Sequence, residues 1–329
     1  MDEILNTDAE ILDSTQNYYD VSICIISYNK SKYIPDAIQS VLMQETVCSY
    51  EIVIGDNASD DGTQDLLKKY HADDPEKFCL IFNRQNLGLT ANMFNTMCKA
   101  KGKYIIILYA DDYWIDPSKL QRQFEFMESH PAYVGVSTPL EYRYDGEDNG
   151  FKQFPPGFMY DKPVNLDRYL NGYDFPMAGL MFRKQILTDN IKHFQIMTES
   201  SPKADDASFC ILILMKGDIF LIGKITAVYR CFRENAGASN YNSVNTAYMR
   251  CENSIELLNN LDRLTGNSLD LGVRYGFILT SAFSGILSHK ITLSQYAGLT
   301  KKMNAVYKNR HLRLLFKGVC RKMELKIRK

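Results

Sequence analysis

An apolar run that ends in two adjacent aspartates limits how this chain can fold more than any other feature. The segment KYIIILYADDY, residues 103–113, carries Ile105 to Leu108 without a polar interruption and then reaches Asp111 and Asp112. Such a run is typical of a strand buried on both faces, as in the parallel sheet of an α/β fold. In open α/β sheets the ligand crevice lies outside the carboxyl ends of the strands. We therefore expect Asp111 and Asp112 to lie at a ligand site.

Two neighbouring carboxylates at such an edge need compensation, because each disfavours the charged form of the other. We therefore expect a cation or a hydrogen-bond donor beside Asp111 and Asp112. The alternative interpretation is a polar turn before a helix, since Asp116 and Pro117 are residue types preferred at the N-cap and N1 positions. Asp116 can serve that turn by itself, so the pair stays available for a ligand.

The amino-terminal third of the chain alternates between strand and helix patterns. Strands are predicted over residues 21–27, 51–55 and 78–82, and helices over residues 33–44, 64–70 and 91–100. Strands separated by helices at this spacing form βαβ units, which place parallel strands side by side. The predicted fold class is therefore α/β. Further strands are expected over residues 178–183 and 219–229, and a further helix over residues 205–215.

The residue pattern divides the chain into three regions. We expect an N-terminal lead of loose packing over residues 1–19, a catalytic α/β domain over residues 20–240 and a helical C-terminal region over residues 241–329. Within the α/β domain, residues 142–161 are rich in Gly, Pro, Asp and aromatic residues, which predicts an irregular loop over the sheet. A chain of 329 residues can bury one large core or two modest ones.

Composition excludes some partners and indicates a compartment. The formal net charge is −1, so the chain as a whole offers no electrostatic reason to bind nucleic acid. The eight cysteines include no C-x-x-C pair and no metal-ligand spacing with histidine. Several of them, such as Cys24, Cys210 and Cys231, lie in apolar stretches. Buried free thiols suit a reducing compartment, so we expect a cytoplasmic protein.

No segment has the pattern of a secretory signal or of a membrane-spanning helix. Residues 1–20 are acidic, and the longest apolar stretch, residues 271–287, is interrupted by Arg274 and falls short of the ~20 apolar residues that spanning requires. Residues 301–329 hold eleven Lys or Arg against one acid, Glu324. A basic amphipathic helix there could lie on the inner membrane face as a peripheral contact. The alternative is a solvated face packed on its own domain, or an oligomer contact.

Polar residues follow three of the predicted strands, at residues 27–29, 56–57 and 111–112. The carboxyl ends of parallel strands meet at one edge, so an aromatic ring, an amide and several carboxylates are expected together. A ring beside a polar edge partner suits a nucleotide base. Oxygen-only ligands suit Mg²⁺ or Mn²⁺, which keep substrate phosphates in their shell. Neither a G-x-G-x-x-G pattern nor a Walker loop follows the first strand, which argues against a dehydrogenase or a P-loop enzyme.

Four segments together resemble the family 2 glycosyltransferases, which have the GT-A fold. They are VSICIISYNKSKYIPDAIQSVLMQ, YEIVIGDNASDDGT, NLGLTANMF and GKYIIILYADDYW, and they match in order and spacing. The resemblance covers roughly residues 20–240. It implies a mixed, mostly parallel sheet flanked by helices, followed here by a C-terminal helical extension.

The resemblance also implies where the donor nucleotide binds. Tyr28 would stack on the base with Ser27 nearby, and Asp56 and Asn57 would contact the base and ribose. Asn57 stands where the family often has a second Asp, so that contact differs here. Asn86, in the segment that resembles the family's Asn-Gly stretch, would shape the pocket rather than react.

The acidic pair matches the family's Asp-x-Asp-type motif. Asp112 is then the direct metal ligand, and Asp111 a metal ligand or a contact to the ribose or sugar. Phe232 occupies the position of the family's usual His, so the contact made by that His is lost. Arg230 is expected at the diphosphate, with an ordinary surface Arg as the alternative. Trp114 could form an aromatic wall for a sugar ring or belong to the core.

The family's catalytic base matches Asp206, which follows Asp205 at the start of a predicted apolar helix. In an inverting displacement an acceptor hydroxyl attacks the anomeric carbon, and one carboxylate accepts its proton. A neighbouring acid such as Asp205 favours the protonated form of the base. The alternative is a carboxylate that merely caps the helix.

The resemblance therefore implies an inverting, metal-dependent glycosyltransferase. Its donor would be a nucleotide diphosphate sugar, expected to be UDP-linked, and its acceptor the hydroxyl of a glycan or lipid-linked acceptor in surface polysaccharide biosynthesis. One alternative is a nucleotidyltransferase, although the turn Tyr28-Asn29-Lys30-Ser31 lacks the glycines such enzymes carry. The other is a non-catalytic module that binds a sugar nucleotide or a glycan. An oligomer is compatible with all of these.

Overall fold

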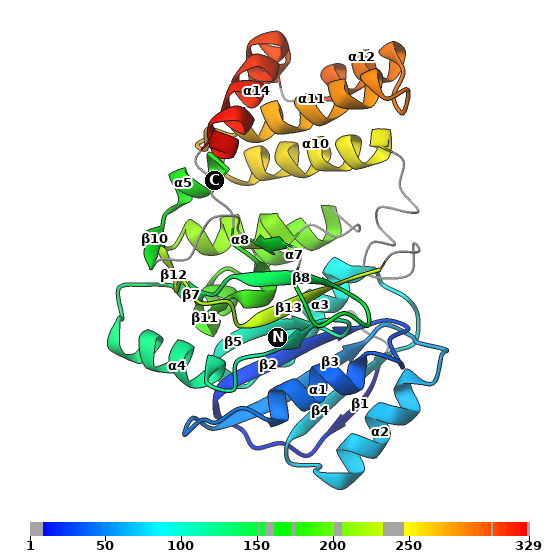
Figure 1. The fold of residues 1–329 in the computed structure, drawn as a ribbon, viewed down its shortest axis with the longest axis vertical. Coiled ribbons are helices and arrows are strands. Elements are labelled where there is room, and N and C mark those ends of the chain that lie inside the picture. The colour runs from blue at the N-terminus through cyan, green and yellow to red at the C-terminus, as the bar shows by residue number, and fades with distance from the viewer. Residues whose placement is uncertain are drawn as a thin grey trace.

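The computed structural model describes residues 9–150, 152–154, 161–172, 175–200, 206–232, 247–303 and 305–327. These residues form a large mixed sheet with helices on both faces, a smaller sheet beside it, and a layer of C-terminal helices farther out (Figure 1). The predicted α/β class is therefore confirmed.

The large sheet contains a parallel block at its centre. From edge to edge it runs through β1 (Ala9–Asp13), β4 (Phe78–Asn83), β3 (Tyr50–Asp56), β2 (Tyr19–Ser27), β5 (Gly102–Tyr109), β11 (Met181–Arg183), β7 (Gly135–Ser137), β12 (Ile219–Leu221) and β10 (Lys162–Val164). Strands β4, β3, β2 and β5 are parallel, whereas β1 and β11 join this block antiparallel. The three predicted strands of the amino-terminal third all belong to the block.

Alternation along β2 divides the core into two clusters, one on each face of the sheet. Ile23 and Ile25 pack with α1 (Ile34–Leu42), α2 (Thr63–Asp73) and α4 (Lys119–Ser129). Cys24 and Ile26 belong to the other cluster, with α3 (Leu89–Lys99) and α7 (Ile191–Ser200). Successive side chains of a strand point to opposite faces. A strand covered on both sides is therefore mostly apolar, as residues 23–26 of β2 and 104–108 of β5 are.

An edge strand forms within the predicted lead. Residues 9–13 pair antiparallel with β4, with Ala9 opposite Asn83 and Asp13 opposite Cys79. Without this strand, β4 would leave a row of backbone groups unpaired at the edge. The expectation of loose packing therefore fails for these five residues. The mixed polarity of AEILD gives too little periodicity to detect such a short strand.

The small sheet was not expected from the sequence. Its strands, in order, are β6 (Tyr113–Trp114), β13 (Ala227–Cys231), β8 (Leu140–Tyr144) and β9 (Lys152–Phe154). An irregular loop was predicted over residues 142–161, but β8 and β9 form an antiparallel hairpin there, and residues 151 and 155–160 lie outside the described residues. The strand predicted over residues 219–229 divides into β12, in the large sheet, and β13, in the small one. These strands are too short for their alternation to stand out.

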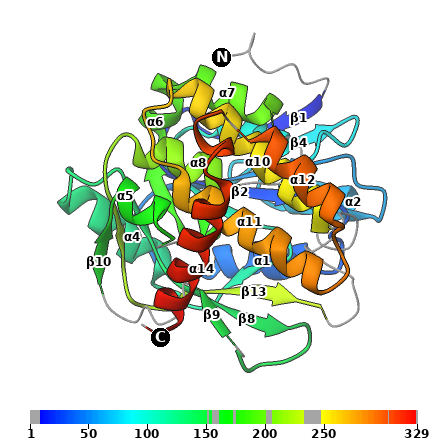
Figure 2. The same ribbon diagram turned by 90° about the horizontal axis from the view of Figure 1, so that it is seen from above.

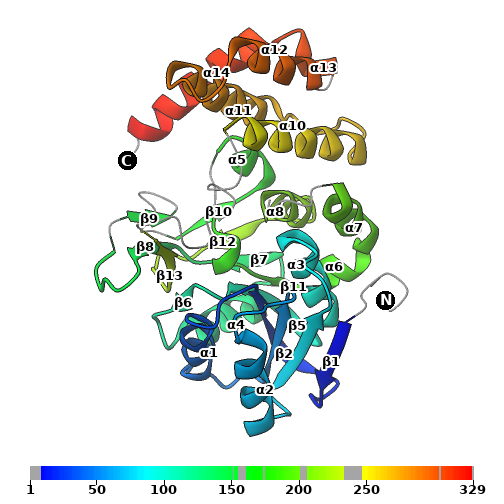
Figure 3. The ribbon, with the colours of Figure 1, turned by 90° about the vertical axis from the view of Figure 1, so that its right-hand side faces the viewer.

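The C-terminal region is helical, as expected, and packs as a layer over the α/β fold (Figure 3). Its helices are α10 (Ala247–Leu264), α11 (Gly272–Leu287), α12 (Leu293–Lys302), α13 (Ala305–Lys308) and α14 (His311–Ile327). Helix α14 crosses α11 (Figure 2) where Gly276 meets Gly318. A Cβ atom on Gly318 would lie 2.3 Å from the carbonyl oxygen of Gly276, so the crossing requires glycine.

The remaining helices connect this layer with the sheet. They are α5 (Leu166–Leu170), the 3₁₀ turn η1 (Met177–Gly179), α6 (Lys184–Asp189) and α8 (Asp206–Leu214). One continuous apolar cluster extends from α3 through α8 to α10 and α11. Within the part of the chain that the structure describes, no helix combines the length and the apolar character that crossing a membrane requires.

A lysine is fully buried between α4 and the small sheet. Lys119 Nζ donates to the hydroxyls of Thr138, at 2.8 Å, and Thr226, at 3.1 Å, and lies 5.4 Å from the centre of the Trp114 ring. Burial lowers the pKa of Lys119 to about 7. Trp114 itself is 2% exposed and belongs to the core, so it forms no wall for a sugar ring.

We expect Lys119→Met to stabilise the protein at pH 7 by about 1–4 kcal/mol, because the buried ammonium has no carboxylate partner at bonding distance. Thr138 and Thr226 hydrogen-bond each other, so they keep a partner when the ammonium is removed. Between pH 7 and the ordinary lysine pKa, the unfolded wild type binds more protons than the folded form. Wild-type stability therefore rises with pH in this window, and the gain from Lys119→Met shrinks. Urea unfolding at pH 7 and pH 9.5 measures both effects. Lys103→Met, at an exposed ion pair, is the control. A loss of stability at both pH values would contradict the prediction.

Candidate functional site

The carboxyl ends of β2, β3 and β5 meet at one edge, as the sequence predicted. Ser27 is in register with Asp56, and Ile26 with Tyr109. The backbone N–H of Asn57 donates to the Ser27 carbonyl at 3.0 Å, which ties the first two loops together. The polar residues that follow the three strands therefore lie in one region of the molecule.

The acidic pair is buried and compensated in the expected way. Asp111 and Asp112 are 3% and 2% exposed. The ammonium of Lys30 lies 3.0 Å from Asp111 Oδ2, and the backbone N–H of Arg230 donates to Asp112 Oδ1 at 3.0 Å. A cation and a hydrogen-bond donor thus stand beside the pair. Asp116 serves the turn instead, since it accepts from the Ser118 N–H and pairs with Lys224.

One carboxylate oxygen of the pair is left without a partner. Asp112 Oδ2 is buried and accepts no hydrogen bond within the described part of the chain. Burial, followed by the charge of Asp111, raises the pKa of Asp112 well above its usual value. An oxygen with unmet acceptor capacity beside a second carboxylate suits a hard divalent cation. Two carboxylates leave most of a six-ligand shell to water and to a bound ligand.

No complete metal cage is present among the described residues, since none of them form a group of three or more His, Cys, Asp or Glu able to hold a metal ion. Two carboxylates are too few ligands for a closed structural metal centre, so the pair can supply only part of a coordination shell.

A clasp between two loops holds the β2–α1 turn beside the pair. Asn29 has a left-handed backbone, with φ 51°, and its side chain donates to Asp60 Oδ1 while its own Oδ1 accepts from the Asp60 N–H. The backbone N–H of Lys30 donates to Thr63 Oγ1 at 3.0 Å. Tyr28, in the same turn, is 41% exposed. The clasp thus presents an aromatic ring to solvent at the sheet edge.

Asp56 lies at this edge, but both of its oxygens are engaged. It is fully buried and accepts from the Ser59 N–H, from Ser59 Oγ and from Gln64 Nε2, at 2.5–3.0 Å. A nucleotide base that contacts Asp56 would therefore share a carboxylate oxygen with Ser59 or Gln64. Ser27 Oγ is buried and has no hydrogen-bond partner among the described residues. A pocket of about 770 Å³ adjoins Ser59, Gln64 and Arg84.

Asn57 and Asn86 form a bonded pair that shapes the β4–α3 loop. Asn57 Nδ2 donates to Asn86 Oδ1 at 2.8 Å, and Asn57 Oδ1 accepts from the Leu87 N–H at 2.9 Å. Beneath them, Asn92 donates to the Gly55 carbonyl at 2.8 Å. A Cβ on Gly55 would lie 2.0 Å from Thr96 Oγ1, so α3 packs closely on β3 there. The amides hold the loop in place.

Arg230 lies beside the acidic pair, but its guanidinium turns toward other carboxylates. It donates to the Asp111 carbonyl at 2.9 Å, to Asp145 at 2.9 Å and to Asp36 at 2.7 Å. Its side chain is 11% exposed, so it is not an ordinary surface arginine. Phe232, at the position where the family has His, packs edge-on against Tyr33 with 5.2 Å between the ring centres.

The base candidates can be placed only in part. Asp206 begins helix α8, as the sequence predicted, but its side chain is not described. Asp205 lies outside the described residues. The assignment of the base therefore stays a prediction.

Lys30, Asp36 and Asp145 are the site residues to which the sequence assigned no role. Lys30 stands three residues beyond the end of β2, in the first of the four segments that resemble the family, and the need to compensate two carboxylates was the signal that could have identified it. Asp36 and Asp145 meet through Arg230 from α1 and from the turn after β8. The β8–β9 hairpin was not predicted, and no other sequence signal indicates that Asp36 and Asp145 lie close together.

Comparison with known families gives one match over half of the chain. A family profile described as Glycosyl transferase family 2 matches residues 22–190. This range includes the clasp between Asn29 and Asp60, the side-chain amides of Asn57, Asn86 and Asn92, and the acidic pair.

Curated relatives match parts of the chain. An uncharacterised protein of Mycobacterium tuberculosis is 29% identical over 211 residues, which are 64% of this chain and 58% of that protein. The putative teichuronic acid biosynthesis glycosyltransferase TuaG of Bacillus subtilis is 36% identical over 142 residues, 43% of this chain and 55% of TuaG. WfaP of Escherichia coli, named as a UDP-Glc:alpha-D-GlcNAc-diphosphoundecaprenol beta-1,3-glucosyltransferase, is 35% identical over 117 residues, 36% of this chain and 45% of WfaP. The match thus spans less than two thirds of each of these relatives.

Solved structures share the fold over nearly the whole chain. Residues 1–349 of S. aureus TarS in complex with UDP-GlcNAc superpose with a TM-score of 0.64 at 16% identity, covering 93% of this chain and 90% of that one. The mannosyltransferase PcManGT of Pyrobaculum calidifontis, in complex with GDP-Man and Mn²⁺, gives a TM-score of 0.52 at 16% identity, covering 98% and 92%. At these identities the likeness concerns the fold.

Proposed function

The chain belongs to glycosyl transferase family 2, and we propose that it is a glycosyltransferase that transfers a sugar from a UDP-linked donor with inversion. The acceptor is the hydroxyl of a glycan or of a lipid-linked glycan in surface polysaccharide biosynthesis. The family assignment favours a glycosyltransferase over a nucleotidyltransferase, and loss of sugar transfer in Asp206→Asn would distinguish an enzyme from a non-catalytic module. The names of TuaG and WfaP support the pathway class, and the donor in the name of WfaP supports UDP.

The observation that carries the proposal is the buried Asp111–Asp112 pair with its unpartnered Oδ2, at the same edge as the exposed ring of Tyr28. Asp112, with Asp111, would hold Mn²⁺ or Mg²⁺ against the donor diphosphate. When bound, the cation would stabilise the negative charge that develops on the leaving diphosphate. The neighbouring fold of PcManGT, solved with GDP-Man and Mn²⁺, supports this choice of cation.

The remaining residues of the edge would bind the nucleotide. Tyr28 stacks on the base, with Ser27 beside it, while Asp56 and Asn57 line the base and ribose. Asn86 fixes the loop that closes this side. Arg230 holds the acidic pair through its backbone and side chain, and reaches the diphosphate only if it leaves Asp36 and Asp145.

Asp206 is proposed as the base, with Asp205 as the neighbouring acid. The acceptor oxygen forms a bond to the anomeric carbon while the bond from that carbon to the diphosphate oxygen breaks. The hydroxyl proton passes to Asp206, and the electron pair of the broken bond stays on the diphosphate. One displacement of this kind inverts the anomeric configuration.

A donor screen tests the proposal. UDP-glucose, UDP-GlcNAc and GDP-mannose are each added with and without Mn²⁺, and the melting temperature is measured. A donor at about 100 times its Kd stabilises the folded protein by about 2.7 kcal/mol. We expect a UDP-sugar to raise the melting temperature only with Mn²⁺, and UDP release to follow. A response to the GDP-sugar alone would overturn the choice of donor.

Lys30→Met is expected to raise the affinity for Mn²⁺ in the absence of nucleotide roughly tenfold, which corresponds to about 1.4 kcal/mol. Lys30 is the ammonium that balances Asp111, so its removal leaves the pair more attractive to another cation. Free Mn²⁺ measured by electron paramagnetic resonance gives the affinity. Lys32→Met, which breaks an exposed pair with Asp145, is the matched control. Equal Mn²⁺ affinity in wild type and Lys30→Met would contradict the prediction.

We also propose that residues 301–329 make a peripheral contact with the inner membrane face. A lipid-linked acceptor, such as the one in the name of WfaP, would be presented there. The excess of Lys and Arg over acids in this region supports an anionic surface as the partner.

A further inference from the structure

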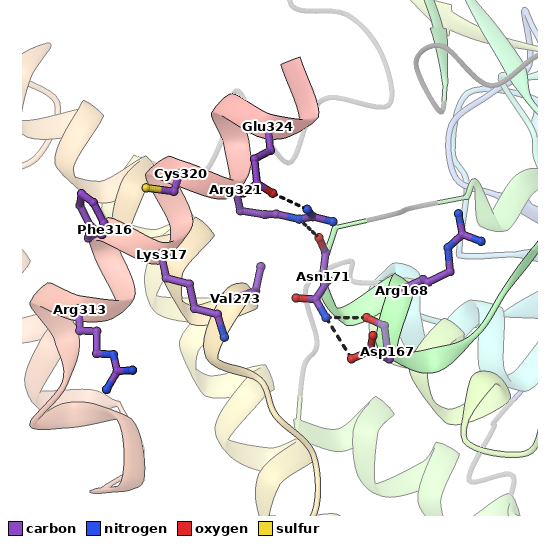
Figure 4. A pocket seen from close by; sticks show the side chains of 10 residues that line it. All are labelled: Asp167, Arg168, Asn171, Val273, Arg313, Phe316, Lys317, Cys320, Arg321 and Glu324. Atoms are coloured by element: carbon purple, nitrogen blue, oxygen red, sulfur yellow. Dashed lines mark hydrogen bonds and ion pairs between the residues drawn. The ribbon is translucent and has the colours of Figure 1, made fainter. Parts of the chain in front are cut away.

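A pocket of about 560 Å³ lies between the α/β fold and the C-terminal helices (Figure 4). One wall comes from α5 and the residue after it, Asn171, and the other from α14, with Val273 of α11 at the base. Arg321 of α14 spans the two walls by donating to the Asn171 carbonyl at 2.8 Å. The pocket is therefore a feature of how the two parts pack, and it is separate from the sheet edge that holds the acidic pair.

Basic side chains dominate the pocket. Arg313, Lys317 and Arg321 succeed one another at four-residue spacing along α14. Arg168 lines the other wall from α5, with its guanidinium turned away from α14 and donating to the Pro163 carbonyl at 3.0 Å. Two acids, Asp167 and Glu324, oppose these four cations. The side chain of Arg313 has no hydrogen bond or ion pair within the described residues. Lys317 is 47% exposed, with its nearest carboxylate, Asp270, at 3.6 Å. The pocket thus keeps positive charge available for an external anion.

An exposed apolar stripe runs along α14 beside the basic row. Leu312, Phe316, Val319 and Met323 are 69%, 70%, 36% and 57% exposed. Their spacing of four, three and four residues places them on one face of the helix. The opposite face packs on α11 through Leu314 and Gly318. A helix with one buried face, one exposed apolar face and a basic row between them has the pattern of a helix that lies in a lipid interface.

We propose that this pocket binds the phosphate of an anionic phospholipid while the apolar stripe of α14 enters the interface of the bilayer. The inference rests on the proposed membrane contact and specifies its chemistry: Arg313 and Lys317 bind the lipid phosphate, and Phe316 is the central apolar anchor. Charge selects this occupant, because a second copy of the chain would bring the same cations to the interface, whereas a bilayer surface of phosphatidylglycerol supplies the complementary charge.

Sedimentation of the full chain with vesicles tests the proposal. We expect binding to vesicles of phosphatidylcholine with 30% phosphatidylglycerol, and little binding to phosphatidylcholine alone. The double variant Arg313→Glu/Lys317→Glu should lower the partition coefficient at least tenfold. Lys68→Glu/Lys69→Glu makes the same change of net charge on α2, at the far end of the molecule, and should bind more like the wild type (Figure 1). Equal losses in the two double variants would overturn a specific site.

The apolar anchor is tested by Phe316→Asp, with Val47→Asp as the control, since Val47 is 87% exposed on the distant α1–β3 connection. We expect a loss of vesicle binding only for Phe316→Asp. A dimer in sedimentation velocity that Phe316→Asp converts to a monomer would show that a second copy covers the stripe instead, and would overturn the proposal. So would binding of farnesyl diphosphate at the pocket without any binding of phosphatidylglycerol vesicles. None of these measurements uses a sugar donor, so they can fail while the donor screen succeeds, and the reverse.

Discussion

Replacement of Asp112 by Asn is expected to lower turnover about 10³-fold while it raises the stability of the metal-free protein. Asp112 Oδ2 is the buried oxygen with no partner among the described residues, and its charge is the feature that a divalent cation would need. Asparagine keeps the acceptor for the Arg230 N–H but removes that charge. A loss of several kcal/mol of transition-state stabilisation is typical when charge compensation at a leaving group is removed.

The gain in stability follows from the raised pKa of Asp112. Burial and the charge of Asp111 disfavour its carboxylate in the folded state. Above the ordinary pKa of an aspartate, the folded wild type binds more protons than the unfolded chain, so its stability falls as the pH rises toward the raised pKa. The amide has no charge to bury, so the melting temperature of Asp112→Asn should exceed that of the wild type at pH 7. Activity and stability then change in opposite directions, as expected at a site strained for function.

Asp116→Asn provides a matched comparison four residues away. Asp116 is also buried, but its carboxylate pairs with Lys224 at 2.9 Å and accepts from the Ser118 N–H. Its replacement should therefore lower stability and leave Mn²⁺ affinity unchanged. For each of the two variants, Mn²⁺ titration in the presence of UDP gives the Mn²⁺ affinity, and a melting curve gives the stability. An Asp112→Asn variant that still binds Mn²⁺ as the wild type does would remove Asp112 from the metal site.

The sheet edge could be predicted from the sequence because each of its features depends on a short, continuous segment of the chain. A strand buried on both faces in a parallel block is mostly apolar, so β2 and β5 stand out in the sequence as apolar runs. The polar residues that follow these strands must then meet at one edge of the sheet. The need for a cation beside Asp111 and Asp112 also follows from elementary electrostatics, and Lys30 meets it.

What the sequence did not reveal depends on contacts between distant segments. Arg230 lies far along the chain from Asp36 and Asp145, and they meet only because β13 leaves the large sheet and pairs with β8. The pocket beside α14 likewise needs α5 and α14 to pack together. Strands of three to five residues are too short to give a clear alternating pattern in the sequence. A charged residue whose partner lies in a distant segment gives no periodic signal either.

Replacement of Asp206 by Asn is expected to lower kcat about 10³-fold and to leave UDP affinity unchanged. A positioned base contributes 10²- to 10⁴-fold to a proton transfer, and asparagine cannot accept the proton. The donor nucleotide is bound by other residues in our proposal, so its affinity should not respond. Rates of sugar transfer and of UDP release, together with a UDP titration in Mn²⁺, separate these two effects.

The choice of Asn separates a base from a residue that merely favours the start of a helix. Helix α8 begins at Asp206, and asparagine is preferred at a helix N-terminus about as well as aspartate, so Asp206→Asn should keep the helix and its stability. Asp205→Asn is the control, because it removes only the neighbouring acid and should cause a smaller loss of rate than Asp206→Asn. If Asp206→Asn keeps full turnover, the carboxylate that accepts the proton must be sought elsewhere at the sheet edge.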